Sequence, residues 1–182
     1  MVDCTAAMAT HRNTVRAAAL LLSLVALTVA VLGPAQAGAK SVALLGVHLQ
    51  NDNEMYEPTS DAERARMVTV AEIFKHQLSN SERYSFVEVP PEVQSKIAAG
   101  RTMGECGGCE IEYGQLLGSE IVAWISVQKI SNLILKMNVY MADVQANQIL
   151  FVRSVDLRGN TDESWTRSIR YLIKNYLLAP SK

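Results

Sequence analysis

Aromatic residues, glycine, proline and cysteine are all scarce in this sequence, and neither sign of charge dominates it. Only 6% of the 182 residues are aromatic, which argues against the stacking platforms that bind single-stranded nucleic acid. Ten glycines and five prolines are too few for a collagen or a low-complexity linker. With 17 Lys+Arg against 18 Asp+Glu, the chain has neither a basic nucleic-acid arm nor a disordered acidic tail. The composition therefore indicates an ordinary globular domain with no nucleic-acid partner.

The longest hydrophobic run lies near the N-terminus. Arg12 and Arg16 precede an apolar segment over residues 17–32, which a small-x-small cleavage site follows. This order is typical of a signal peptide, and the apolar core is shorter than the ~20 residues that cross a bilayer. We therefore expect residues 1–37 to be a cleaved signal peptide and residues 38–182 to be a single periplasmic domain without stable membrane insertion. An inner-membrane anchor formed by the uncleaved signal is the alternative.

The hydrophobic periodicity after the signal predicts alternating strands and helices. Strands are expected over residues 41–48, 84–89, 121–127, 133–141 and 149–157. Helices are expected over residues 60–79, 91–99 and 110–117, and over about 17 residues after a cap at Asn160. The predicted class is α/β (α+β): a single mixed sheet of about five strands packed against three to four helices. Its last three strands should form a β-meander.

Several local signals support these boundaries. Ser60 and Glu63 have the spacing of a capping box, and Pro90-Pro91 should stop the second strand. Gly118 suits the end of a helix, and Asn147 suits a left-handed turn residue.

Cys106 and Cys109 are the sharpest chemical feature, since Cys4 lies in the predicted signal. Haem attachment would need a histidine where Glu110 stands. Zinc would need two more ligands from His48, His76 or distant carboxylates. A thioredoxin-like dithiol should open a helix directly after a strand, and no such strand is evident. A local disulfide is favoured, thiol–disulfide exchange is the alternative, and no metal or cofactor is expected.

Other polar residues have both functional and ordinary interpretations. His48, Asp52, Glu54 and Tyr56 belong to a loop expected after the first strand, where open sheets bind ligands, although an ordinary solvated loop is the favoured interpretation. Asp162 and Glu163 suit helix capping better than paired acid–base catalysis, and Arg158 is expected to pair with one of them. Trp165 is assigned to the core. Motifs for nucleophilic, phosphate-binding or zinc-protease chemistry are absent from the sequence, so no catalytic residue is assigned.

Three segments carry a resemblance to a known family: Cys106-Gly-Gly-Cys109, Val127-Gln-Lys-Ile-Ser-Asn-Leu-Ile-Leu135 and Arg158-Gly-Asn-Thr-Asp-Glu-Ser-Trp165. They resemble a family of exported bacterial proteins of unknown function. The order of strands and helices is also similar to the small α/β domain of the curli secretion protein CsgG, the TolB N-terminal domain and outer-membrane accessory lipoproteins. A lipid-anchoring cysteine after the signal, present in the lipoproteins, is missing here.

The resemblance implies a non-enzymatic periplasmic binding or assembly accessory protein, associated with a periplasmic dehydrogenase system in some relatives. Its partner would be another periplasmic or envelope protein. The expected contact surface is an exposed sheet edge or the loop of residues 48–58, with His48, Asp52, Glu54, Arg158 and Asp162 as contact residues. The alternative function is a thiol–disulfide redox accessory that uses Cys106 and Cys109.

Overall fold

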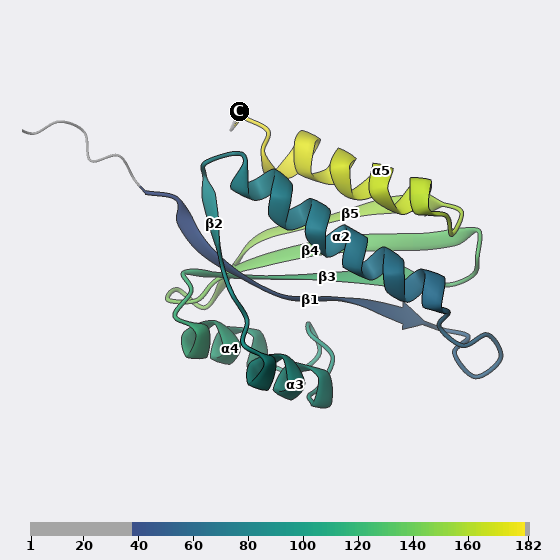
Figure 1. The fold of residues 1–182 in the computed structure, drawn as a ribbon, viewed down its shortest axis with the longest axis horizontal. Helices are drawn as coiled ribbons and strands as arrows, with labels where there is room; N and C mark the ends of the chain where they lie inside the picture. Colours follow the sequence, from purple (N-terminus) through teal and green to yellow (C-terminus); the bar gives the residue numbers. More distant parts are fainter. Residues whose placement is uncertain (1–37, 181–182) are drawn as a thin grey trace, which may run out of the picture. The chain divides into compact units, whose positions relative to one another are not determined.

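The computed structural model describes residues 38–180, which form one mixed sheet with helices on both faces (Figure 1). The strands are β1 (Lys40–Asn51), β2 (Tyr84–Val87), β3 (Ile121–Lys129), β4 (Ile134–Asp143) and β5 (Gln148–Arg158), in the order β2-β1-β3-β4-β5. β1 pairs in parallel with both of its neighbours, whereas β3, β4 and β5 form an antiparallel meander. The predicted α/β class, mixed sheet and meander are confirmed. The predicted signal peptide lies outside the described residues.

Four α-helices cover the sheet within the described part of the chain. They are α2 (Asp61–Ser79), α3 (Pro91–Ala99), α4 (Cys109–Leu117) and α5 (Asp162–Leu172), and α5 continues into a π-helical turn, η2 (Ile173–Leu177). α2 and α5 lie on one face of the sheet, and α3 and α4 lie on the other (Figure 1). None of the helices in this part of the chain is long and apolar enough to cross a membrane.

The larger hydrophobic core lies between the sheet and the α2–α5 layer. Phe74 of α2 and Trp165 and Ile169 of α5 are fully buried there, as predicted for Trp165. A smaller core under α3 and α4 contains Val122 and Trp124, both from β3. Because β3 is buried on both faces, its nearly continuous apolar sequence is explained.

The local signals in the sequence were mostly correct. Both halves of the Ser60–Glu63 capping box form at the start of α2, and α4 ends at Gly118 in a left-handed conformation. Asn147 is also left-handed, with φ of 52°. The cap of α5 was misassigned: Thr161, rather than Asn160, accepts the hydrogen bond from the N–H of Ser164 (3.2 Å).

Three boundaries differ from the prediction. β1 continues to Asn51 because residues 48–51 pair with Ser126–Lys129 of β3, so the expected loop begins later than His48. β2 stops at Val87, two residues early. The last α-helix ends at Leu172 after 11 residues rather than about 17, and the π-helical turn that follows changes the helical phase, so Tyr176 is half-exposed.

Candidate functional site

About two thirds of β1 has no strand beside it on one side within residues 38–180. β2 pairs only with Lys40–Ala43, whereas β3 pairs with β1 as far as Asn51. β2 ends at Val87, and Pro90-Pro91 then directs the chain into α3. Because proline fixes φ and donates no ladder hydrogen bond, this pair prevents β2 from following β1 further. The remainder of β1, residues 44–51, is therefore an open sheet edge.

Two hydrogen bonds show which way the backbone groups of β1 point. The N–H of Lys40 donates to the carbonyl of Arg83 on the β2 side (3.0 Å). The N–H of Asp52, just beyond the strand, donates to the carbonyl of Lys129 on the β3 side (3.1 Å). Since successive residues of a strand direct their backbone groups to opposite edges, the even-numbered residues change sides within β1.

The change of side occurs at a β-bulge. The register with β3 shifts between Leu44 and Gly46, and Gly46 has φ of 147°, which residues with a side chain rarely adopt. After the bulge, the even-numbered residues direct their backbone groups toward β3, as Asp52 does. The odd-numbered residues therefore direct theirs the other way, which places the N–H and C=O groups of Val47 and Leu49 at the open edge. These are the groups that an additional strand would bind.

A cleft of about 750 Å³ runs along this open edge. Residues 44–50 of β1 line it at the sheet, and Ala71 and Lys75 line it from α2. The opposite wall is formed by α3 and the loop of residues 100–105, because α2 and α3 lie on opposite faces of the sheet (Figure 1). Glu88 closes the end at which the chain leaves β2.

The side chains of β1 alternate between the two walls. Val47 and Leu49 pack against the larger core, so the intervening His48 lies on the α3 side. Burial lowers the pKa of His48, and the nearby carboxylate of Glu105 opposes this only in part. His48 is therefore neutral near pH 7. With Arg101 and Glu105 on the same side, the cleft carries charges of both signs and selects neither strongly anionic nor strongly cationic ligands.

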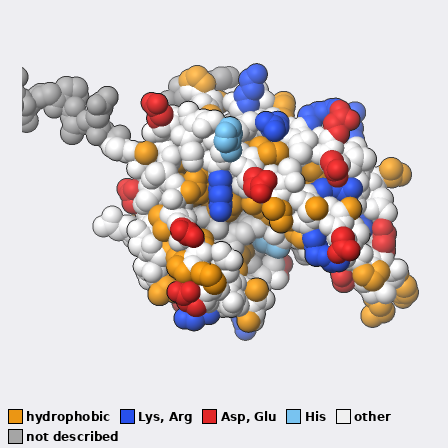
Figure 2. Space-filling view, in the orientation of Figure 1, with side chains coloured by type: hydrophobic (Ala, Val, Ile, Leu, Met, Phe, Trp, Pro, Cys, Tyr) orange, Lys and Arg blue, Asp and Glu red, His pale blue; other side chains and the backbone are white. Residues whose placement is uncertain are grey.

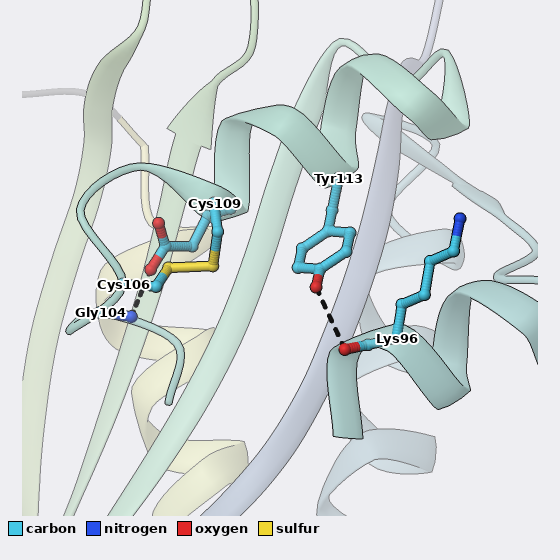
Figure 3. Close-up of a disulfide and its surroundings, with 6 residues drawn as sticks. Lys96, Gly104, Cys106, Cys109 and Tyr113 are labelled. Carbon is cyan, nitrogen blue, oxygen red and sulfur yellow. Dashed lines mark hydrogen bonds between the residues drawn. A yellow bond between two sulfur atoms is a disulfide. The ribbon is translucent and has the colours of Figure 1, made fainter. Parts of the chain in front are cut away.

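The α3–α4 loop, which supplies part of one wall, is held at three points, and Figure 3 shows two of them, the hydrogen bond of Gly104 and the disulfide. Met103 is buried in the smaller core. The N–H of Gly104 donates to the buried carboxylate of Glu110. Cys106 and Cys109 form a disulfide, with their Cα atoms 5.6 Å apart. These three attachments fix the conformation of the loop where it forms a wall of the cleft.

The disulfide bears on the zinc alternative for the two cysteines, whereas a structural bridge and thiol–disulfide exchange both contain this bond. Ligand atoms of Cys106, Cys109 and Glu110 lie within 4.8 Å of one another, but both sulfurs are used by their mutual bond. A zinc site would need free thiolates, and neither His48 nor His76 belongs to this cluster. Cys109 is the first residue of α4, as in a thioredoxin-like dithiol, but a loop precedes it where that motif has a strand.

A buried ion pair links β3 to α2. The Nζ of Lys129 lies 2.8 Å from Glu63 Oε1 and 3.2 Å from Glu57 Oε1, and the Lys129 and Glu63 side chains are 1% and 2% exposed. Asn160 donates to Glu63 Oε1 (2.7 Å) and accepts from Trp165 Nε1 (3.0 Å). The network thus joins β3, the start of α2 and the β5–α5 turn.

The network keeps both partners charged. Burial alone would raise the pKa of Glu63, but hydrogen bonds from Lys129, Ser60 and Asn160 lower it to about 2. Burial alone would likewise lower the pKa of Lys129, but its bonds to Glu63 and Glu57 raise it. With every partner supplied by the fold itself, this cluster is a structural clamp.

This clamp was not predicted from the sequence, although a signal was present. Lys129 continues the alternation of the buried residues Ile125 and Val127, so a lysine stood at an inward-facing position of a strand. Glu63 was assigned only its capping role, which it also performs.

The predicted contact residues do not form one site. His48 lines the cleft, whereas Asp52 and Glu54 belong to the loop between β1 and α2. Arg158 is the last residue of β5, and Asp162 is the first residue of α5. Only His48 therefore contributes to the cleft.

The expected ion pairing of Arg158 is wrong among the described residues. Asp162 accepts a hydrogen bond from Arg66 Nε (2.6 Å), and Glu163 pairs with Arg167 one turn further along α5. Both acids lie in the first turn of α5, where they complement the helix dipole.

A family model described as a protein of unknown function (DUF2380) matches residues 40–177. The chain belongs to this family. The match begins with β1 and ends with η2, so it includes every element described above. No curated protein matches the sequence.

Several solved structures are similar to this chain at low sequence identity. The LpoB C-terminal domain from Salmonella enterica is 15% identical, with 69% of this chain and 87% of that chain covered and a TM-score of 0.46. Lipoprotein GNA1162 from Neisseria meningitidis is 14% identical, with 76% and 99% covered and a TM-score of 0.46. The PelC dodecamer from Paraburkholderia phytofirmans is 14% identical, with 78% and 89% covered and a TM-score of 0.47.

Proposed function

We propose that this protein is an exported, non-enzymatic accessory domain that binds an extended segment of another envelope protein at the open edge of β1. The observation that carries the proposal is the juxtaposition of unpaired edge groups with a cleft. Val47 and Leu49 direct backbone donors and acceptors toward a space of about 750 Å³ between α2 and the α3–α4 loop. Strand addition satisfies such groups with main-chain hydrogen bonds.

The two walls of the cleft determine which side chains a bound segment should carry. Alternate side chains of an added strand would face opposite walls. Those on the α2 side would meet Ala71 and the ammonium of Lys75, and those on the other side would meet Ile97, Ala98 and Met103. The cleft therefore suits a segment with small or apolar residues at alternate positions and an acidic residue on the α2 side.

The envelope location and the accessory role rest on the sequence. The pattern of residues 1–37 favours export, and the disulfide agrees with an oxidising compartment. Association with a periplasmic dehydrogenase system stays a prediction from the family resemblance.

Filling the cleft tests the proposal. Peptides would be selected from a phage-displayed random library on the purified domain, and a selected peptide would be measured by calorimetry. Ala98→Trp, in the wall of the cleft, should weaken binding at least tenfold. Ala99→Trp is the matched control, since Ala99 is also an exposed residue of α3 but lies outside the cleft. The control should bind as tightly as the natural sequence.

Hydrogen exchange provides the second measurement. The amides of Val47 and Leu49 should become protected when the peptide binds, because they donate to the added strand. A library that yields no binder, a peptide unaffected by Ala98→Trp, or protection confined to other segments would contradict the proposal.

Thiol–disulfide exchange is the second candidate, favoured by the position of Cys109 at the start of α4. A helix N-terminus stabilises a thiolate. A reduction potential of about −120 to −200 mV with little loss of stability on reduction would support it, whereas a value below about −300 mV would assign the bridge to structure.

A further inference from the structure

The loop between β1 and α2 presents two adjacent hydrophobic side chains to solvent. Met55 and Tyr56 are 86% and 88% exposed, more than any other large hydrophobic residue in the described part of the chain. In Figure 2, hydrophobic side chains gather at the lower right, where Figure 1 shows this loop projecting beyond the sheet. We call these two residues the Met55–Tyr56 knob.

The knob sits on a loop that its own hydrogen bonds hold in shape. Asn51 Nδ2 donates to Glu54 Oε2 (2.9 Å) and to the carbonyl of Glu57 (2.7 Å). The Glu54 carboxylate also accepts from the N–H of Thr59 (3.1 Å) and from its hydroxyl (2.7 Å). The N–H of Tyr56 donates to the carbonyl of Asn53 (2.9 Å). The two apolar side chains are thus presented by a preorganised turn.

The neighbouring β3–β4 hairpin fixes this loop to the domain. Asn53 Nδ2 donates to the carbonyl of Ile130 (2.9 Å). Glu57 accepts from Asn132 Nδ2 (2.6 Å) and from the buried Lys129 (3.2 Å). Because the amides and carboxylates at the base of the knob already have partners, covering the loop would leave few of them unsatisfied.

Acidic residues flank the knob in the sequence. Asp52, Glu54, Glu57 and Asp61 are exposed, whereas Arg64 is the single basic residue between positions 51 and 64 and is paired with Asp61 (2.7 Å). The charge of Lys129 is buried and balanced by two glutamates. An acidic rim is repelled by an anionic lipid surface and by the same rim on a second copy, and it attracts a basic surface.

We infer that the Met55–Tyr56 knob is a second interaction surface, which inserts into an apolar pocket of a folded protein whose rim carries lysine and arginine. Tyrosine and methionine are enriched in protein interfaces, and a few central side chains usually carry most of the affinity. Preorganisation of the loop lowers the entropy lost on docking. The surface is separate from the cleft at β1, so either can fail without the other.

Site-specific photocrosslinking identifies what contacts the knob. A photoreactive phenylalanine analogue would replace Met55, leaving Tyr56 intact, in the full chain within its own cell envelope. The same analogue at Val68 is the control, because Val68 is an exposed hydrophobic residue of α2. The protein crosslinked from position 55 and not from position 68 would then be purified and its affinity for the domain measured by calorimetry.

The expected result is an affinity that falls at least tenfold with Tyr56→Ser, is unchanged by Val68→Ser and by Ala98→Trp, and decreases when NaCl is raised from 50 to 300 mM. Sedimentation tests whether the knob instead contacts a second copy of the domain or a membrane. It is measured for the purified domain alone and with vesicles of phosphatidylcholine or phosphatidylglycerol. Self-association or vesicle binding that Tyr56→Ser abolishes would overturn the inference. Equal crosslinking from positions 55 and 68, or a partner whose affinity is indifferent to Tyr56→Ser, would overturn it as well.

Discussion

Replacing Lys129 by methionine should destabilise the domain by about 3 kcal/mol at pH 7, because breaking a buried pair leaves the other charge uncompensated. The lowered pKa of Glu63 indicates the size of this loss of stability. The pKa of Glu63 is lowered from 4.5 to about 2 in the folded state. Each pKa unit is worth about 1.4 kcal/mol, so Lys129, Ser60 and Asn160 together favour the carboxylate form by about 3 kcal/mol, and the bond from Lys129 is the largest of these contributions. The nearly complete burial of both side chains means that solvent screening reduces this little.

The stability contributed by this ion pair should depend on pH in a direction that the two pKa shifts determine. A carboxyl group whose pKa is lowered by folding stabilises the native state above pH 4.5, and this contribution disappears as the pH falls from about 4.5 toward 2. The cost of Lys129→Met should therefore shrink as Glu63 becomes protonated. At the alkaline end, the raised pKa of Lys129 means that its contribution is complete below pH 10.5 and is lost as the pH rises through the folded value.

Urea unfolding followed by circular dichroism at pH 7 and pH 4 measures the cost of Lys129→Met and its decrease toward acid pH. The double variant Lys129→Met with Glu63→Gln removes both charges while leaving an acceptor for Asn160, and it should recover at least half of the lost stability. A cost below about 1 kcal/mol at pH 7, or an equal cost at both pH values, would refute the assignment of this pair as the clamp between β3 and α2.

Three further outcomes follow from the structure. Replacing both Cys106 and Cys109 by serine should cost at most about 2 kcal/mol in thermal unfolding, since the bridge closes only a short loop; a larger loss would mean that the loop needs the bridge to fold. Gly114→Ala should destabilise the domain by about 1–3 kcal/mol, although alanine normally favours a helix, because its Cβ would lie 2.5 Å from Val144 and 2.6 Å from Val122; a stabilised variant in the same urea titration would disprove this packing. Asn160→Ala should cost about 2 kcal/mol by leaving Trp165 Nε1 buried and unpaired, and an unchanged midpoint would show that water replaces the amide.

Local signals predicted the helices and strands well because they act within a few residues. The capping box at Ser60, the break at Pro90-Pro91 and the left-handed Asn147 each depend on backbone geometry that neighbouring side chains determine. The error at the start of α5 has the same origin: Asn160 and Thr161 are both good caps, and the buried network with Glu63 takes the Asn160 side chain.

The candidate site was less predictable because it joins distant segments. Of the predicted contact residues, only His48 lines the cleft, since Asp52 and Glu54 lie beyond the end of β1 in the loop. The cleft needs residues from α2 and from the α3–α4 loop, and periodicity does not say which helix lies beside which half of a strand.

The sequence alone determined the order of elements, their approximate limits and the presence of a meander, because hydrophobic spacing, caps and turns are short-range properties. Only the tertiary structure decided that β1 lies between β2 and β3, that β2 leaves about two thirds of β1 uncovered, and that Lys129 meets Glu63. These outcomes depend on which distant segments pack together. The open edge of β1 and its cleft belong to this second class, whereas the Met55–Tyr56 knob lies in the loop of residues 48–58 that the sequence indicated, and the tertiary structure added its exposure.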